Sequence, residues 1–350
     1  MKLSPLLERL DGAIDELRAA HPADGPGFCL ALLAQGDVLR QVHHGLADLS
    51  WQQPLDGDAR HYMASESKPW VAALVMQEVA EGRLALDTDL RPLLPALGEY
   101  EQPLCAGHLL RHTSGIPDYL FLWGTQLGRH EHDFIAREQA LALITQAGES
   151  SFQPGLRHEY SNSNYLLLAE LLQLQSGLTL AELAQRRFFA PWGMGSSSFE
   201  ADPWRVLPRR ARSYGRVAAE PAEAQGWQEL PVPLGTWGDG GLWSTLNDQL
   251  RAERRWHEDW LLQGERSLWA RCAAADERYG PADGPYRFGL EWLQAGDQRL
   301  LFHGGGYGGF SCLLLRNPAQ GVSLVMLSNC DGFDNDAERW AQRLWGPAQA

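Results

Sequence analysis

Apolar segments with strand character lie at both ends of the chain, and this placement limits the fold more than any other feature of the sequence. Residues 28–33 and 38–42 flank a Gln-Gly-Asp turn, which predicts a β-hairpin near the N-terminus. Near the C-terminus, residues 309–315 and 322–328 flank a second turn-forming stretch. The economical assembly is an α+β fold in which both ends of the chain build one antiparallel sheet and the middle is inserted into it.

The middle of the chain carries mostly helical periodicity, and further amphipathic helices are expected at residues 5–20 and 336–344. The expected helices of the middle region span residues 68–82, 138–147, 164–176 and 179–188. Residues 215–240 are rich in Pro and Gly and are expected to form a long surface excursion. We therefore expect a single domain over residues 1–350. Its α/β part would comprise about 1–60 and 285–350, and its helical part about 70–285.

Charge and composition exclude several classes of partner. The formal net charge of -14 would repel a phosphate backbone, so no nucleic-acid partner is expected. No apolar run is long enough to span a bilayer, so no membrane partner is expected either. Glu8 and Asp11 interrupt the N-terminus where a signal peptide has its apolar core, which predicts a cytoplasmic protein, or a periplasmic one if a leader has been removed. The five widely spaced cysteines are expected to be reduced core thiols, and the oligomeric state is open.

The first chemically suggestive motif is Ser65-Glu66-Ser67-Lys68. On a helix, residues three apart share a face, so Lys68 can reach the Ser65 hydroxyl group whereas Ser67 points elsewhere. A desolvated, neutral lysine can take the proton of a serine and make it a nucleophile. Free backbone N–H groups at a helix start would also favour developing negative charge. The alternative is an ordinary helix start with a solvated lysine.

The second motif is Tyr160-Ser161-Asn162, in a loop that leads into a helix. The Tyr160 hydroxyl group could exchange protons with the serine and the leaving group. The Asn162 amide could hold both Lys68 and a substrate carbonyl. The alternative is a plain N-cap.

The third motif is His303-Gly304-Gly305-Gly306, which follows an apolar stretch and predicts an edge strand without side chains. A substrate backbone could lie against such a strand. The N–H of Gly306 could pair with that of Ser65 as an oxyanion hole, and His303 would add a polar or cationic wall. The alternative is a glycine-rich hairpin loop.

In this order, the three motifs resemble the S-x-x-K, Y-x-N and K-T-G or H-x-G signature of the serine β-lactamase and penicillin-binding protein superfamily. Residues 110–117 are similar to its L-x-H-T-S-G stretch, and residues 240–245 to its G-G-[LM]-x-S-T segment. The resemblance covers about residues 25–330. It implies a five-stranded antiparallel sheet flanked by helices, an all-helical subdomain, and a site at their junction.

The resemblance also implies a mechanism. Ser65 would attack a carbonyl group while Lys68 and Tyr160 shuttle its proton, and water would hydrolyse the acyl-Ser65 ester without a metal or cofactor. His303 in place of lysine resembles the branch with D-aminopeptidases, one class of D-Ala-D-Ala carboxypeptidases and some esterases. The expected function is therefore hydrolysis of small D-amino-acid amides or peptides. A carboxylesterase comes second and β-lactam hydrolysis third, and a protein that binds acyl donors with little turnover is the alternative of another class.

Three further hypotheses can be weighed on the sequence. A lipase-like α/β-hydrolase would need a G-x-S-x-G elbow, which the sequence lacks. His108 and His112 have zinc-ligand spacing, but Leu109 stands where zinc proteases carry glutamate, so scaffold roles are expected. A set of tryptophans near the motifs is expected to line an apolar acyl pocket. These are Trp70, Trp237, Trp243 and Trp292.

Overall fold

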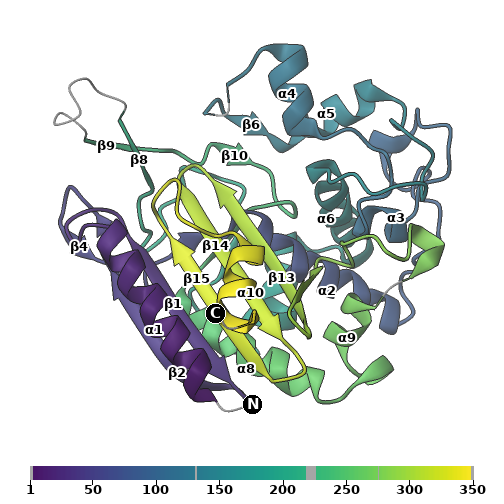
Figure 1. Ribbon diagram of the computed structural model, residues 1–350. Coiled ribbons are helices and arrows are strands. Elements are labelled where there is room, and N and C mark those ends of the chain that lie inside the picture. The colour runs from purple at the N-terminus through teal and green to yellow at the C-terminus, as the bar shows by residue number, and fades with distance from the viewer. Residues whose placement is uncertain (1–2, 131, 218–225, 275, 348–350) are drawn as a thin grey trace.

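The computed structural model describes residues 3–130, 132–217, 226–274 and 276–347. Its centre is an antiparallel sheet built from both ends of the chain, as the sequence predicts (Figure 1). The order along the sheet is β12 (Glu291–Ala295), β13 (Gln298–Tyr307), β14 (Phe310–Asn317), β15 (Val322–Ser328), β1 (Phe28–Ala34) and β2 (Asp37–His44). β1 pairs with β15 along its whole length, which joins the two ends of the chain at the middle of the sheet.

The sheet has six strands where five were expected. The additional strand of the C-terminal part is β12, which forms a tight hairpin with β13 and pairs with it from Ala295↔Gln298 to Glu291↔Phe302. β13 is therefore an edge strand only from His303 onward, not over its whole length. Because β12 stops at Glu291, the glycine-rich half of β13 keeps one side without a neighbouring sheet strand.

Each face of the sheet is covered by helices. α1 (Leu3–Ala20) and α10 (Ala337–Trp345) pack on one face, where they enclose an apolar cluster with alternate residues of β1, β14 and β15. α2 (Ser67–Ala80) and α8 (Leu246–Trp260) belong to the larger core on the other face. Since both faces are covered, β1, β14 and β15 are buried at every position.

The helical part follows α2 in the chain. Its helices include three segments that the sequence predicted within a few residues and further short ones. They are α3 (Ala106–Leu110), α4 (Tyr119–Leu127), α5 (Arg137–Ala147), α6 (Asn162–Ser176), α7 (Leu180–Ala184), the π-helical turn Gln185–Phe189, and α9 (Leu268–Ala273). Short 3-10 turns lie at Ala64–Glu66, Pro95–Leu97, Gly264–Arg266 and Glu277–Tyr279.

Short strands outside the main sheet connect the two parts. They are β3 (Leu46–Asp48), β4 (Gln53–Pro54), β5 (His61–Tyr62), β6 (Ile135–Ala136), β7 (Ser198–Phe199), β8 (Tyr214–Arg216), β9 (Trp227–Glu229), β10 (Leu234–Gly235) and β11 (Leu242–Ser244). The expected surface excursion at 215–240 is only partly correct. Residues 218–225 lie outside the described residues, whereas Thr236 and Asp239 are buried because this backbone runs into the core.

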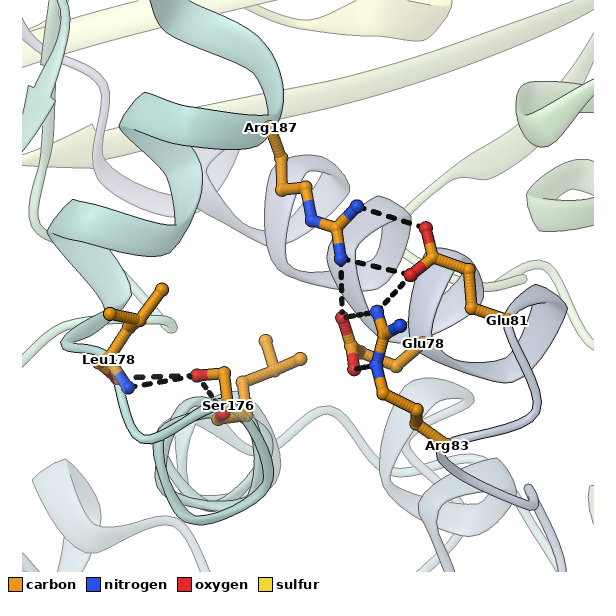
Figure 2. A network of polar contacts seen from close by, with 7 residues as sticks. Glu78, Glu81, Arg83, Ser176, Leu178 and Arg187 are labelled. Carbon is orange, nitrogen blue, oxygen red and sulfur yellow. Dashed lines mark hydrogen bonds and ion pairs between the residues drawn. The ribbon is translucent and has the colours of Figure 1, made fainter.

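α2 is a buried central helix, and an ion-pair network anchors its C-terminal end (Figure 2). Glu78 is 2% exposed, and it accepts hydrogen bonds from Arg83 at 2.6 and 2.7 Å. Arg187, from the π-helical turn, bonds Glu81 and lies 3.5 Å from Glu78. A buried carboxylate is stable only when it is paired, so both arginines stabilise Glu78, and Arg187 also ties α2 to the segment that follows α7.

No single helix in the described part of the chain has the length and apolar composition for crossing a bilayer. The bent pair Asn162–Ser176 and Leu180–Phe189 meets the criterion only when both helices are taken together.

Candidate active site

Ser65 lies in the 3-10 turn Ala64–Glu66, which runs directly into α2. Ala64 has φ +44°, a left-handed conformation that costs free energy for a residue with a side chain. Surrounding contacts hold the turn, since the Met63 N–H donates to the Leu242 carbonyl oxygen at 2.8 Å and the Glu66 N–H to the Met63 carbonyl oxygen at 2.9 Å. Such enforced strain is typical of positions where a side chain must be aimed.

Lys68 is fully buried, and its ammonium group points at Ser65. Its Nζ donates to Ser65 Oγ at 3.0 Å, to Asn162 Oδ1 at 2.9 Å and to the Asp239 carbonyl oxygen at 2.7 Å. Burial disfavours the charged form and lowers the pKa of Lys68 to about 8. The alternative of a solvated lysine is therefore wrong, and a neutral amine is accessible near neutral pH.

Tyr160 approaches Ser65 from the other side. Its hydroxyl group donates to Ser65 Oγ at 3.0 Å, and its ring lies 4.9 Å from Lys68 Nζ. Although 38% of the residue is exposed, the hydroxyl group points inward, and burial raises the pKa of Tyr160 above its usual value. The raised pKa favours the protonated form of the Tyr160 hydroxyl group at rest.

Asp118 orients Asn162, and the motifs alone did not point to it. Asp118 Oδ2 accepts from the backbone N–H of Asn162 at 2.7 Å and from its Nδ2 at 2.9 Å, which turns Asn162 Oδ1 toward Lys68. Asp118 Oδ1 also caps α4 by accepting from the N–H of Leu120. An Asp directly before a helix is a recognisable N-cap signal, but only the fold shows its second contact.

His112 supports Tyr160 and has the expected scaffold role. The two rings stack with centroids 4.2 Å apart, and His112 Nδ1 lies 3.2 Å from the Ser161 N–H and 3.1 Å from Asn164 Nδ2. Within the described residues, no group of three or more His, Cys, Asp or Glu side chains is placed to hold a metal ion.

His303 is buried beside the site as a neutral imidazole. Its Nδ1 lies 2.7 Å from the Gly304 carbonyl oxygen and must donate to it, so Nε2 accepts from the Tyr286 hydroxyl group at 2.9 Å. Burial and the nearby Lys68 lower the pKa of His303 to about 3. Of the two alternatives for this wall, polar or cationic, burial therefore favours the polar, uncharged one.

The glycine half of β13 lies against the nucleophile turn. A Cβ atom at Gly305 would stand 2.4 Å from the Met63 carbonyl oxygen and 2.9 Å from the backbone nitrogen of Ser65. No side chain fits there, so the close approach of strand and turn requires glycine. Gly306 is the next residue along this strand, and its pairing with Ser65 as an oxyanion hole stays a prediction.

The expected tryptophan lining is wrong for Trp70. This residue is 3% exposed and packs among Phe188, Phe189 and Trp269, in the core behind α2. Trp243 is also largely buried, beside Tyr62.

The beta-lactamase family model matches residues 11–346, and the chain belongs to this family. It is 29% identical over 308 residues to a D-aminopeptidase from Brucella anthropi, which covers 88% of this chain and 57% of that protein. It is 26% identical over 315 residues to a D-aminopeptidase from Brucella ovis, covering 89% and 58%. The chain thus spans less than two thirds of the length of these relatives.

Two solved structures share the fold. The octameric penicillin-binding protein homologue from Pyrococcus abyssi aligns with a TM-score of 0.80 at 21% identity, over 98% of this chain and 76% of that one. A D-amino acid amidase from Ochrobactrum anthropi, solved with D-phenylalanine, aligns with a TM-score of 0.75 at 21% identity, over 97% of both chains. The sheet and its flanking helices are those of the β-lactamase and transpeptidase fold.

Proposed function

We propose that the protein is a serine hydrolase that forms an acyl ester on Ser65 and acts on small D-amino-acid amides or short peptides. The observation that carries the proposal is the position of Ser65 Oγ, which lies 3.0 Å from both Lys68 Nζ and the Tyr160 hydroxyl group. A serine held between a base of lowered pKa and a second proton carrier has the arrangement that nucleophilic catalysis needs.

In the proposed acylation, neutral Lys68 takes the proton of Ser65 as Oγ attacks the substrate carbonyl carbon. With a pKa of about 8, roughly a tenth of Lys68 is neutral at pH 7. The N–H groups of Ser65 and Gly306 stabilise the oxyanion. Tyr160 then protonates the leaving nitrogen and recovers a proton from Lys68. Water hydrolyses the ester by the reverse transfers.

The substrate class rests on the relatives named D-aminopeptidase and on the neutral state of His303. A cation on this strand would bind a substrate carboxylate such as the one that penicillins carry. A neutral imidazole offers hydrogen bonding without that charge, which favours amides and esters. The cytoplasmic location and the absence of nucleic-acid and membrane partners stay predictions.

The test compares the wild type with Ser65→Ala, Tyr160→Phe and Ser67→Ala. Ser67→Ala is the control, because the Ser67 hydroxyl group accepts from the Leu242 N–H and does not bond Lys68. The substrates are the p-nitroanilides of D- and L-alanine, p-nitrophenyl acetate and a penicillin, followed by absorbance and by intact mass. We expect turnover of the D-anilide and an acyl adduct in the wild type and Ser67→Ala, a strong loss in Tyr160→Phe, and neither in Ser65→Ala. Turnover of the ester alone would favour the carboxylesterase, and no turnover with a stable adduct would favour the binding protein.

A further inference from the structure

A buried cluster of three charged residues lies beside the nucleophile turn, and the proposed mechanism does not use it. Its members are Glu66 (0% exposed), Arg316 on β14 (4%) and Glu253 on α8 (2%). Arg316 and Glu253 form a two-pronged ion pair, with Nη2 to Oε1 at 2.6 Å and Nε to both carboxylate oxygens at 3.0 Å. The Arg316 guanidinium group also stacks on Trp256, with 5.1 Å to the ring centroid.

Glu66 is left outside this pair. Neither of its carboxyl oxygens has a hydrogen-bond partner among the described residues, and the nearest contact to a cation is 3.9 Å, from Oε1 to Arg316 Nη2. Because Glu253 already pairs with Arg316, an ionised Glu66 would leave the three residues with one net buried negative charge. Burial, with Glu253 adding to it, raises the pKa of Glu66 well above its usual value even though Arg316 opposes the shift.

A further titratable group that faces Glu66 is the Cys312 thiol on β14, whose pKa is raised by burial and by Glu66 itself. Cys312 is a neutral neighbour that donates from Sγ to the Met63 carbonyl oxygen at 3.1 Å. Cys312 and Arg316 are four residues apart on one strand, so their side chains share a face of the sheet. β14 therefore contacts the nucleophile turn at two places, at Met63 through Cys312 and at Glu66 through Arg316.

The position of Glu66 in the chain links the cluster to the chemistry. It directly follows Ser65, and its own N–H closes the strained turn by bonding the Met63 carbonyl oxygen at 2.9 Å. The backbone N–H of Ser65, which the proposed mechanism uses for the oxyanion, belongs to the same turn. A negative charge on the adjoining side chain would oppose the negative charge that develops on the substrate oxygen.

We propose that the carboxyl group of Glu66, set between Arg316–Glu253 and the nucleophile turn, is held uncharged and so keeps negative charge away from the N–H of Ser65. Glu253 has a defined part in this arrangement. By pairing with Arg316, it offsets part of the attraction that would otherwise draw an ionised Glu66 into an ion pair. This inference rests on the proposed acylation of Ser65, but not on the identity of the substrate.

The experiment measures acylation of Ser65 by a fluorophosphonate probe, and turnover where a substrate is available, between pH 6 and pH 10 in the full chain. The variants are Glu66→Gln, Glu253→Gln and the double variant, each checked for folding by circular dichroism. We expect the rate of Glu66→Gln relative to the wild type not to fall as the pH rises, since any charge gained at this position slows only the wild type. We expect Glu253→Gln to lose about tenfold in rate, mostly in kcat, because Glu66 then ionises beside Arg316.

The double variant separates a charge effect from a merely structural one. If the charge on Glu66 causes the loss, Glu66→Gln restores most of the rate in the Glu253→Gln background. A double variant slower than Glu253→Gln, or a ratio of Glu66→Gln to wild type that falls as the pH rises, would overturn the proposal. If Glu253→Gln does not fold, the pH dependence of that ratio decides alone. A wild type that neither reacts with the probe nor turns over substrate would instead contradict the proposed function.

Discussion

Asp118→Asn tests the orientation of Asn162, because it changes one oxygen atom to an NH2 group at nearly constant volume. Asp118 Oδ2 accepts two hydrogen bonds from Asn162, at 2.7 and 2.9 Å, and Oδ1 caps α4. An asparagine can still cap the helix, so the cap contributes little to the loss. In place of Oδ2, the amide nitrogen of asparagine would face the two N–H donors of Asn162, so both hydrogen bonds would be lost. Hydrogen bonds to a charged group are each worth about 1.5–3 kcal/mol.

We therefore expect the free energy of unfolding to fall by about 3 kcal/mol, allowing for partial relaxation of the amide groups. Catalysis should suffer as well, since Asn162 Oδ1 then no longer faces Lys68 Nζ at 2.9 Å. Displacement of a positioning group commonly costs about a hundredfold in rate, so we expect a decrease of that order in kcat.

Urea unfolding measures the first effect, and steady-state kinetics with the best substrate of the wild type measure the second. Asp336→Asn is the matched control, because Asp336 caps α10 through the Arg339 N–H at 2.9 Å on the opposite face of the sheet. This control variant should lose little free energy of unfolding and should keep the kcat of the wild type. Wild-type kcat in Asp118→Asn would refute the conclusion that Asp118 orients the site.

Three further outcomes follow from the geometry. Only neutral Lys68 can accept the serine proton, so the acylation rate should rise with pH and level off above about 8. A pH–rate profile of kcat/KM measures this dependence, and a rate that falls over this range would contradict the assignment of Lys68 as the base. The same profile should show no transition from His303 between pH 5 and 7, since the pKa of this residue is about 3. Tyr286→Phe removes the hydrogen bond to His303 Nε2, and the shape of the profile between pH 5 and 7 should stay the same in this variant. Arg187→Ala should lower the free energy of unfolding by only about 1 kcal/mol and leave kcat unchanged, because Glu78 keeps Arg83 as its partner. A melting temperature equal to that of the wild type would show that the contact between Arg187 and Glu78 contributes nothing to stability.

The parts of the fold that the sequence predicted are those with a strong local pattern. α5 and α6 begin and end within two residues of their predicted bounds, because apolar periodicity and a following glycine mark them. β12 was not predicted, since Glu291–Ala295 has no clear alternation and becomes a strand by pairing with β13. α8 was also not predicted, although Thr245 caps it, because its polar residues dominate the segment.

The candidate site divides in the same way. Ser65 and Lys68 are three residues apart, so helix geometry alone predicts their contact, and the structure places the two atoms 3.0 Å apart. Tyr160 and Asn162 were expected at the site through the family resemblance, and the structure brings both to it. The role of Asp118 in orienting Asn162 could not be assigned in advance, because the local sequence does not indicate which backbone or side-chain amide its second oxygen binds.

What the sequence by itself determined is the set of reacting groups and the sheet that carries them, since both depend on residue type and short spacing. Only the tertiary structure decided the charge states: a lysine with a pKa of about 8, a neutral His303, and a Glu66 whose carboxyl group is buried beside an arginine already paired with Glu253. The physical reason is that the ionisation of a side chain depends on its desolvation and on the charges around it. Both are set by segments far apart in the chain that meet only when it folds.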